Sequence, residues 1–223
     1  MRAAAADGGR SMNGPARPGV ILDRDGTLID FVRDAELGAV VSAFHPDHIR
    51  LLPGVVQGLA LLQDAGFVLA IATNQPGAAK GQIPESAITR TNQALVDALA
   101  REGIHIEAVR ACLHHPEGGP GGDPTLATDC GCRKPKPGML LSLVQELGLD
   151  PARSWMVGDA AVDVLAARGA GLRAGLLFEW GRCEMCPVRG GFDEIPMIRP
   201  DASASRFDEL ARRLRDSLAT APG

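Results

Sequence analysis

Short apolar runs alternate along this 223-residue chain with segments of helical periodicity, and this alternation limits the possible folds more than any other feature. Strands that are separated by helices pair in parallel and carry the helices on both faces of the sheet. The expected class is therefore α/β. Strands are expected at residues 19–22, 67–72, 104–113 and 155–157, and helices at 53–66, 84–101, 138–147, after Asp163 and at 207–218.

The chain length suits one sizeable domain. Residues 1–18 are rich in Ala, Gly, Pro and Arg and predict a disordered tail, whereas residues 19–180 form the expected main domain. Residues 181–223 are expected to be a C-terminal extension with a terminal helix. We expect a three-layer sandwich around a mostly parallel, Rossmann-like sheet, whose ligands bind at the carboxyl ends of the strands. The segment between Asp25 and Thr73 is too short for a large cap domain.

Composition narrows the class of partner. The net charge of −4 and the absence of basic residues interleaved with aromatic ones disfavour a nucleic-acid partner. No apolar stretch is long enough to span a membrane. These features favour a cytoplasmic, monomeric protein that acts on a small soluble substrate, and the motifs described below add the expectation that this substrate is a phosphorylated metabolite. The five cysteines, an odd number in two short segments, suit metal ligands better than disulfides.

The first polar motif directly follows the first predicted strand, with Asp23 and Asp25 two residues apart. Residues at this spacing can point to the same side on leaving a strand, so both carboxylates are expected to face one pocket. Two like charges so close need a cation, and Mg²⁺ prefers carboxylate oxygens. The alternative is an ordinary solvated turn, which aspartate and glycine also favour.

Two further motifs offer partners for an anion. The hydroxyl of Thr73 and backbone amides near it are suited to hold phosphate oxygens, although a simple turn is the commoner use of such residues. Lys134 is expected to supply the counter-charge that Asp23 and Asp25 require, against the alternative of a basic surface loop stiffened by proline.

A third group has the composition of a zinc site. Cys112 and His114 precede a Gly-, Pro- and Asp-rich loop, and Cys130 and Cys132 follow it. Three thiolates and one imidazole make a closed tetrahedral set, which is typical of structural zinc, and such an ion would pin residues 112–132. Free cysteines on a long loop are the alternative, and His115 competes with its neighbour as a ligand. Cys183 and Cys186 are expected to be surface thiols, since no second pair lies nearby.

The motif beginning at Asp23 resembles the first motif of the haloacid dehalogenase-like superfamily, and the remaining motifs follow in the family's order over residues 20–170. The resemblance implies that Asp23 forms an aspartyl-phosphate, while Asp25 protonates the leaving oxygen and then activates water. It implies that Asp159 is a third carboxylate on Mg²⁺, beside Asp23 and Asp25. Asp163 either ligates weakly and orients metal-bound water or is only a first-turn residue favoured by the helix dipole.

By the same resemblance, Lys134 neutralises charge between nucleophile and phosphate. The residues expected to bind substrate are Asn74, Gln75, Arg133 and Lys134, and Thr73 is counted with the catalytic group.

The combination of Cys-x-His-x-Pro, Cys-x-Cys and Arg-Lys-Pro resembles a narrower branch, the D-glycero-D-manno-heptose 1,7-bisphosphate 7-phosphatases, with histidinol phosphatases as relatives. It selects His114 over His115 and implies removal of the 7-phosphate of the heptose bisphosphate. Ala160 and the segment after Asp30 depart from the pattern of this branch. Three alternatives stay open: a histidinol-phosphate phosphatase, a DNA-end phosphatase, and a zinc-dependent interaction module with vestigial phosphatase motifs.

Overall fold

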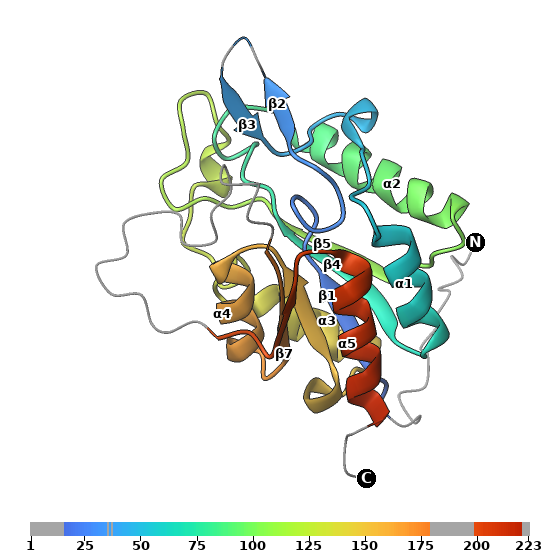
Figure 1. The fold of residues 1–223 in the computed structure, drawn as a ribbon. Helices are drawn as coiled ribbons and strands as arrows, with labels where there is room; N and C mark the ends of the chain where they lie inside the picture. The colour runs from blue at the N-terminus through green and yellow to red at the C-terminus, as the bar shows by residue number, and fades with distance from the viewer. Residues whose placement is uncertain (1–15, 35, 37, 179–198, 220–223) are drawn as a thin grey trace, which may run out of the picture.

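The computed structural model describes residues 16–34, 36, 38–178 and 199–219. Its centre is a six-stranded sheet with the order β5-β4-β1-β6-β7-β8 (Figure 1), in which every neighbouring pair is parallel. The α/β class and the parallel sheet that the sequence predicted are thereby confirmed. The strands are β1 (Gly19–Leu22), β4 (Val68–Asn74), β5 (Ala108–Cys112), β6 (Trp155–Gly158), β7 (Arg173–Leu177) and β8 (Ala202–Ala204).

Alternate residues of the central strands enter opposite cores. In β1, Val20 and Leu22 belong to one buried cluster and Ile21 to the other, as the two-residue period of a strand requires. Helices α1, α2 and α5 supply side chains to the first cluster, and α3 and α4 to the second. Figure 1 shows α1 and α5 on one side of the sheet and α4 on the other. The result is the expected three-layer sandwich, and burial on both faces explains why the strands appear in the sequence as continuous apolar runs.

The predicted helices are all present, with ends that differ by a few residues. They are α1 (Val55–Asp64), α2 (Glu85–Arg101), α3 (Gly138–Leu147), α4 (Ala161–Gly169) and α5 (Phe207–Ala219). α4 begins before Asp163, which therefore lies in its first turn. Strands β7 and β8 had no counterpart among the predicted strands. β8 is only three residues long and contains no apolar run, so pairing with β7 creates a strand that its own sequence does not indicate.

Between β1 and α1 the chain forms only small elements. β2 (Val32–Asp34) and β3 (Ala39–Val41) pair as an antiparallel hairpin, and the short helix η1 (Pro46–His48) follows. No large cap domain is present in the part of the chain that the structure describes, in agreement with the short spacing between Asp25 and Thr73.

The C-terminal segment joins the same sheet and core. Arg168 of α4 pairs with Asp201 at 2.7 Å beside β8, and α5 packs against α1 so closely that a Cβ on Gly58 would lie 2.5 Å from the Phe207 ring. The predicted tail, except for its last three residues, lies outside the described residues, as do Cys183 and Cys186. Among the residues with described structure, no helix has both the length and the apolar character needed to cross a bilayer.

Candidate active site

Three carboxylates from distant parts of the sequence meet at the carboxyl ends of two central strands. Asp23 follows β1 and Asp159 follows the adjacent strand β6, while Asp163 comes from the first turn of α4. Each offers one oxygen, and the three oxygens lie within 4.8 Å of one another. The Asp23 amide donates to the carbonyl of Val157 at 2.8 Å, so the pairing of the two strands fixes the first aspartate beside the second.

The charges in this acidic cluster (Asp23, Asp159 and Asp163) oppose one another. Burial, with the charges of Asp23 and Asp163, raises the pKa of Asp159 well above its ordinary value. Burial also raises the pKa of Asp163 to about 6, although the charge of Lys134 opposes the rise. Three carboxylates in a low-dielectric pocket gain most from a hard divalent cation, which takes oxygen ligands. The donor set of the acidic cluster therefore fits Mg²⁺.

Lys134 lies inside the acidic cluster as its fixed positive charge. Its Nζ is 2.9 Å from Asp23 Oδ1 and 2.7 Å from Asp163 Oδ1, and it donates to the carbonyl of Ala72 at 2.8 Å. Burial disfavours a charged amine, but the carboxylates of Asp163 and Asp23 outweigh that effect and raise the pKa of Lys134. The side chain is therefore a permanent cation that holds two of the three carboxylates in place.

Asn74 fixes the loop that carries this lysine. Its Nδ2 donates to the carbonyl of Lys134 at 3.0 Å, and its Oδ1 accepts from the amide of the same residue at 3.1 Å. Both ends of the amide are thus engaged with backbone. In this structure the predicted substrate-binding residue Asn74 positions Lys134.

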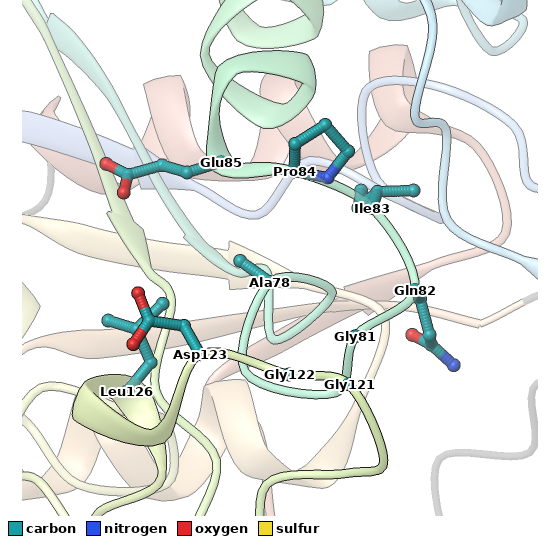
Figure 2. A pocket seen from close by; sticks show the side chains of 10 residues that line it. All are labelled: Ala78, Gly81, Gln82, Ile83, Pro84, Glu85, Gly121, Gly122, Asp123 and Leu126. Atoms are coloured by element: carbon teal, nitrogen blue, oxygen red, sulfur yellow. The ribbon is translucent and has the colours of Figure 1, made fainter.

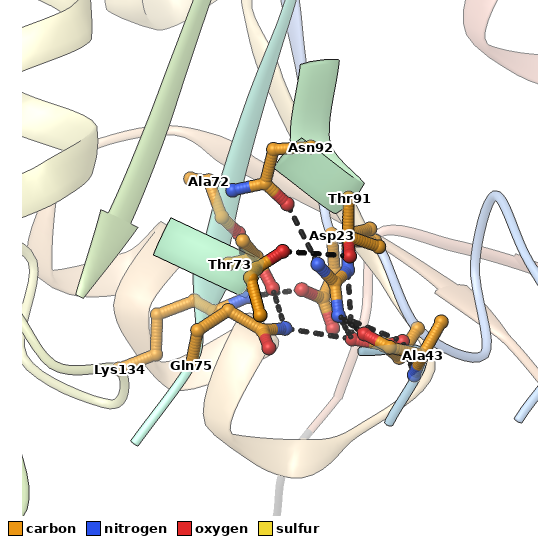
Figure 3. A network of polar contacts seen from close by, with 11 residues as sticks. Asp23, Ala43, Ala72, Thr73, Gln75, Thr91, Asn92 and Lys134 are labelled. Carbon is orange, nitrogen blue, oxygen red and sulfur yellow. Dashed lines mark hydrogen bonds and ion pairs between the residues drawn. The ribbon is translucent and has the colours of Figure 1, made fainter. Parts of the chain in front are cut away.

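Asp25 has a different environment from the one that the two-residue spacing suggested. Its carboxylate is not part of the acidic cluster. Instead, Oδ1 accepts from the amide of Ala43 at 3.0 Å, and Oδ2 accepts from Gln75 Nε2 at 2.7 Å (Figure 3). Residues two apart point to the same side only within an extended strand, and β1 ends at Leu22, before either aspartate. The structure therefore brings Asp23 together with Asp159 and Asp163, and holds the carboxylate of Asp25 separately.

Gln75 connects Asp25 to the end of β4. Its Nε2 also donates to Thr73 Oγ1 at 2.9 Å, and both Gln75 and Thr73 are buried. The predicted substrate-binding amide of Gln75 is therefore occupied within the protein. Burial raises the pKa of Asp25, and the charge of Asp23 adds to the rise, while Arg24 and the hydrogen bonds from Ala43 and Gln75 lower it.

Arg24 is a residue of the site that the sequence motifs did not indicate. Its side chain is fully buried and forms an ion pair with Asp25 at 2.9 Å. Only one signal in the sequence could have indicated this role, namely a basic residue placed between two aspartates at the end of a buried strand.

The predicted zinc ligands form a second cluster, the thiol cluster (Cys112, His114, Cys130 and Cys132), whose ligand atoms all lie within 4.8 Å of one another. Cys112 Sγ lies 3.5 Å from Cys130 Sγ, and Cys132 Sγ lies 3.2 Å from each of the other two sulfurs. These separations exceed a disulfide bond and approach the ~3.8 Å between sulfurs on a tetrahedral zinc ion.

Two observations indicate which histidine belongs to the thiol cluster and which kind of metal the cluster suits. His114 Nδ1 is 3.3 Å from Cys132 Sγ, whereas the Nδ1 of the neighbouring His115 accepts from the amide of Glu117 and lies outside the thiol cluster. Burial, followed by a hydrogen bond with Cys132, raises the pKa of Cys112 above its usual value. A bound cation would favour the thiolate instead, so the thiol cluster suits a soft divalent metal.

The thiol cluster is connected to the acidic cluster through the residues that follow Cys132. The amide of Arg133 donates to Cys130 Sγ at 3.3 Å, and Arg133 Nη1 donates to the carbonyl of His114 at 3.3 Å. Lys134 is the next residue in the chain. The thiol cluster and the acidic cluster are therefore joined by consecutive residues, from Cys132 to Lys134.

The loop after β4 packs against the glycine-rich part of residues 112–132. The amide of Asp123 donates to the carbonyl of Ala78 at 3.1 Å, and a Cβ on Gly122 would lie only 1.9 Å from the carbonyl oxygen of Ala79. These loops border an open hollow of about 480 Å³ (Figure 2). Its lining includes Gln82, Glu85, Asp123 and Leu126.

Comparisons with known proteins agree with this geometry. Among curated proteins, a D-glycero-beta-D-manno-heptose-1,7-bisphosphate 7-phosphatase from Pasteurella multocida is 36% identical over 73% of this chain and 82% of its own length. A protein of the same name from Mesorhizobium japonicum is 35% identical over 88% of this chain and 82% of its own length.

Among solved structures, the D,D-heptose 1,7-bisphosphate phosphatase from B. bronchiseptica, complexed with magnesium and phosphate, superposes with a TM-score of 0.68. It is 28% identical, and the match covers 90% of this chain and 99% of that one. The family model described as haloacid dehalogenase-like hydrolase matches residues 31–171, well over half of the sequence. The chain therefore belongs to the haloacid dehalogenase-like hydrolase family.

Proposed function

We propose that this protein is a Mg²⁺-dependent phosphatase that removes the 7-phosphate of D-glycero-D-manno-heptose 1,7-bisphosphate through an aspartyl-phosphate. The observation that carries the proposal is the meeting of Asp23, Asp159, Asp163 and Lys134 at the carboxyl ends of β1 and β6, with Asp25 held nearby. The names of the similar curated proteins support the choice of sugar.

In the first step, an Asp23 carboxylate oxygen attacks the phosphorus of the substrate. The bond between phosphorus and the leaving oxygen breaks, its electron pair passes to that oxygen, and Asp25 donates a proton to it. Lys134 contributes by holding Asp23 at 2.9 Å while its positive charge offsets that of the incoming phosphate. Burial raises the pKa of Asp25, which makes the group a stronger proton acceptor than an exposed aspartate.

In the second step, the Asp25 carboxylate takes a proton from water, whose oxygen attacks the phosphorus of the aspartyl-phosphate. The bond between phosphorus and Asp23 breaks, and its electrons restore the Asp23 carboxylate as inorganic phosphate leaves. Each aspartate ends in the protonation state in which it began. Arg133 is proposed to grip the substrate and Thr73 to hold phosphate oxygens, as the sequence predicted.

Two metal ions complete the proposal. Asp23, Asp159 and Asp163 would hold Mg²⁺, which supplies charge neutralisation for the phosphoryl oxygens when bound. The thiol cluster would hold a structural Zn²⁺, because its four protein ligands leave no position open for substrate. The cytoplasm as compartment and a monomer as the working state remain predictions.

A substrate panel tests the proposal. Purified protein with Mg²⁺ is offered the heptose bisphosphate, histidinol phosphate and DNA with phosphorylated ends, and phosphate release is measured. We expect kcat/KM to be highest for the heptose bisphosphate and to vanish in Asp23→Asn, whose melting temperature should stay near that of the parent. A preference for histidinol phosphate or DNA would move the substrate assignment. Absence of turnover on every phosphomonoester would favour an interaction module.

A further inference from the structure

Arg24 is the most deeply buried charge near the site, with no exposed surface. A buried guanidinium is costly unless its N–H groups are paired. Nε donates to Asp25 Oδ2 at 3.0 Å, and Nη2 donates to Asp25 Oδ1 at 3.2 Å and to the carbonyl of Ala43 at 2.7 Å. Nη1 donates to Asn92 Oδ1 at 2.6 Å (Figure 3). Each of its three nitrogens therefore has an acceptor.

These contacts fix the Asp25 carboxylate from three sides. Arg24 reaches both of its oxygens, the amide of Ala43 binds Oδ1, and Gln75 Nε2 binds Oδ2. The donors come from the residue next to Asp25, from the segment that follows the β2–β3 hairpin, and from the loop that follows β4. A carboxylate held in this way has one orientation available to it.

We propose that Arg24 is the positioning residue of Asp25 and that Asn92, on α2, is the anchor that holds Arg24 in place. This inference rests on the proposed function, since it assumes that Asp25 transfers protons. Among the described residues, the side-chain hydrogen bond of Asn92 goes to Arg24, and Asn92 is not a member of the acidic cluster, so its effect on Asp25 is expected to pass through Arg24.

The proposal has a consequence that depends on the leaving group. A sugar alkoxide leaves poorly and needs the proton from Asp25, whereas the phenolate of p-nitrophenyl phosphate is a weak base that leaves without one. A misplaced Asp25 should therefore slow cleavage of the sugar phosphate but not the first step with p-nitrophenyl phosphate. The second step, in which Asp25 activates water, should slow for both substrates.

Asn92→Ala removes the anchor and leaves Arg24, Asp25 and all metal ligands in the chain. Gln93→Ala is the matched control, because it makes a similar amide-to-methyl change on the next residue of α2. That residue is exposed, and its side chain donates to Asp97 Oδ1 at 2.9 Å. Asn92→Asp is the rescue variant, since it keeps an oxygen acceptor for Arg24.

For Asn92→Ala we expect kcat on the heptose bisphosphate to fall by roughly 10- to 100-fold, because the acid is displaced rather than removed. In rapid mixing, p-nitrophenol should still appear at close to the parental rate, followed by a slow steady state as the aspartyl-phosphate accumulates. Gln93→Ala should match the parent in both assays, and Asn92→Asp should recover most of the lost rate.

An equal loss of rate for both substrates in the first turnover, or no loss at all, would overturn the positioning role. A loss of the same size in Gln93→Ala would do so too, because it would point to a general effect on α2. These outcomes are distinct from a failure of the proposed function, in which the unaltered protein would not cleave the heptose bisphosphate.

Discussion

The acidic cluster and the thiol cluster are both sets of potential metal ligands, but the fold builds them in opposite ways. Asp23 and Asp159 follow neighbouring parallel strands of the buried sheet, so the backbone places them whether or not a metal is bound. In the thiol cluster only Cys112 belongs to a strand, at the end of β5 on the edge of the sheet, and its other members lie on an irregular loop. The fold alone therefore places the residues of the acidic cluster, whereas a metal bound by the thiol cluster would help to hold its loop in the folded conformation.

The difference has an energetic consequence. The sheet holds the like charges of the acidic cluster close together, and their repulsion lowers the stability of the fold. A bound cation or a proton relieves this repulsion. The thiol cluster offers ligands that a metal joins into one closed unit, so metal binding there adds to folding stability. Changes to the first should mainly alter chemistry, and changes to the second should mainly alter stability.

Gly26→Ala should produce the largest effect, on chemistry. Gly26 has φ +79, and a Cβ there would lie 2.3 Å from Asp159 Oδ2 and 2.8 Å from the Phe31 ring. The carboxylate must move, so we expect kcat/KM to fall about 100-fold. Gly103→Ala is the matched control, since Gly103 has φ +78 and nothing within 4 Å of a Cβ.

Gly103→Ala carries the same backbone strain, about 1 kcal/mol, and should retain full activity. If the two variants had the same kcat/KM, the placement of Asp159 by the fold would not matter to the chemistry, and the comparison between the clusters would fail.

Cys130→Ser should produce the next largest effect, on stability. Loss of one zinc ligand should lower the free energy of unfolding by about 3 kcal/mol, which corresponds to roughly 6–12 °C in melting temperature for a chain of this size. Metal analysis should show that zinc is released. Cys183→Ser, which changes a thiol outside the predicted ligand set, should keep both zinc and melting temperature. If the unaltered protein contained no zinc, the structural role of the thiol cluster would be disproved.

The smallest effect concerns Mg²⁺ and pH. The raised pKa of Asp163, about 6, means that the folded protein retains a proton that the unfolded chain has already released. The contribution of Asp163 to the stability of the metal-free protein is therefore fully present at low pH, and it is lost as the pH rises to about 6. Mg²⁺ relieves the repulsion that remains above that pH.

The rise in melting temperature on adding Mg²⁺ should accordingly be larger at about pH 7.5 than at about pH 5, by roughly 3 °C. Calorimetry at the two pH values measures it, with the zinc content checked before and after. An equal rise at both pH values would show that repulsion within the acidic cluster is not what the ion relieves.

The sequence predicted the structure best where a residue pattern is compatible with few structural roles. The apolar runs predicted four of the strands, because a strand buried on both faces admits little else. Thiols paired at close spacing predicted the thiol cluster, and the structure brings all four of its members together. The family resemblance implied that Asp159 lies beside Asp23, and the parallel sheet explains why, since parallel strands present their carboxyl ends at the same edge.

Sequence reasoning was weakest for side chains whose partner is chosen by tertiary structure. Asn74 and Gln75 were predicted to contact substrate, and the structure adds hydrogen bonds from their amides to Lys134 and Asp25 that the sequence did not indicate. An amide can donate or accept in any direction, so its sequence position does not reveal its partner. The role of Arg24 depends on Asn92, which lies on a helix far along the chain, and no local pattern encodes that contact.

The seam between the loop after β4 and the glycine-rich segment is joined backbone to backbone, with Gly122 pressed against Ala79. Since no side chains separate the two loops there, neither can be exchanged for one of another shape without reshaping its neighbour. To change the shape of this region, both loops would accordingly have to be replaced together, along with the cysteines that flank one of them.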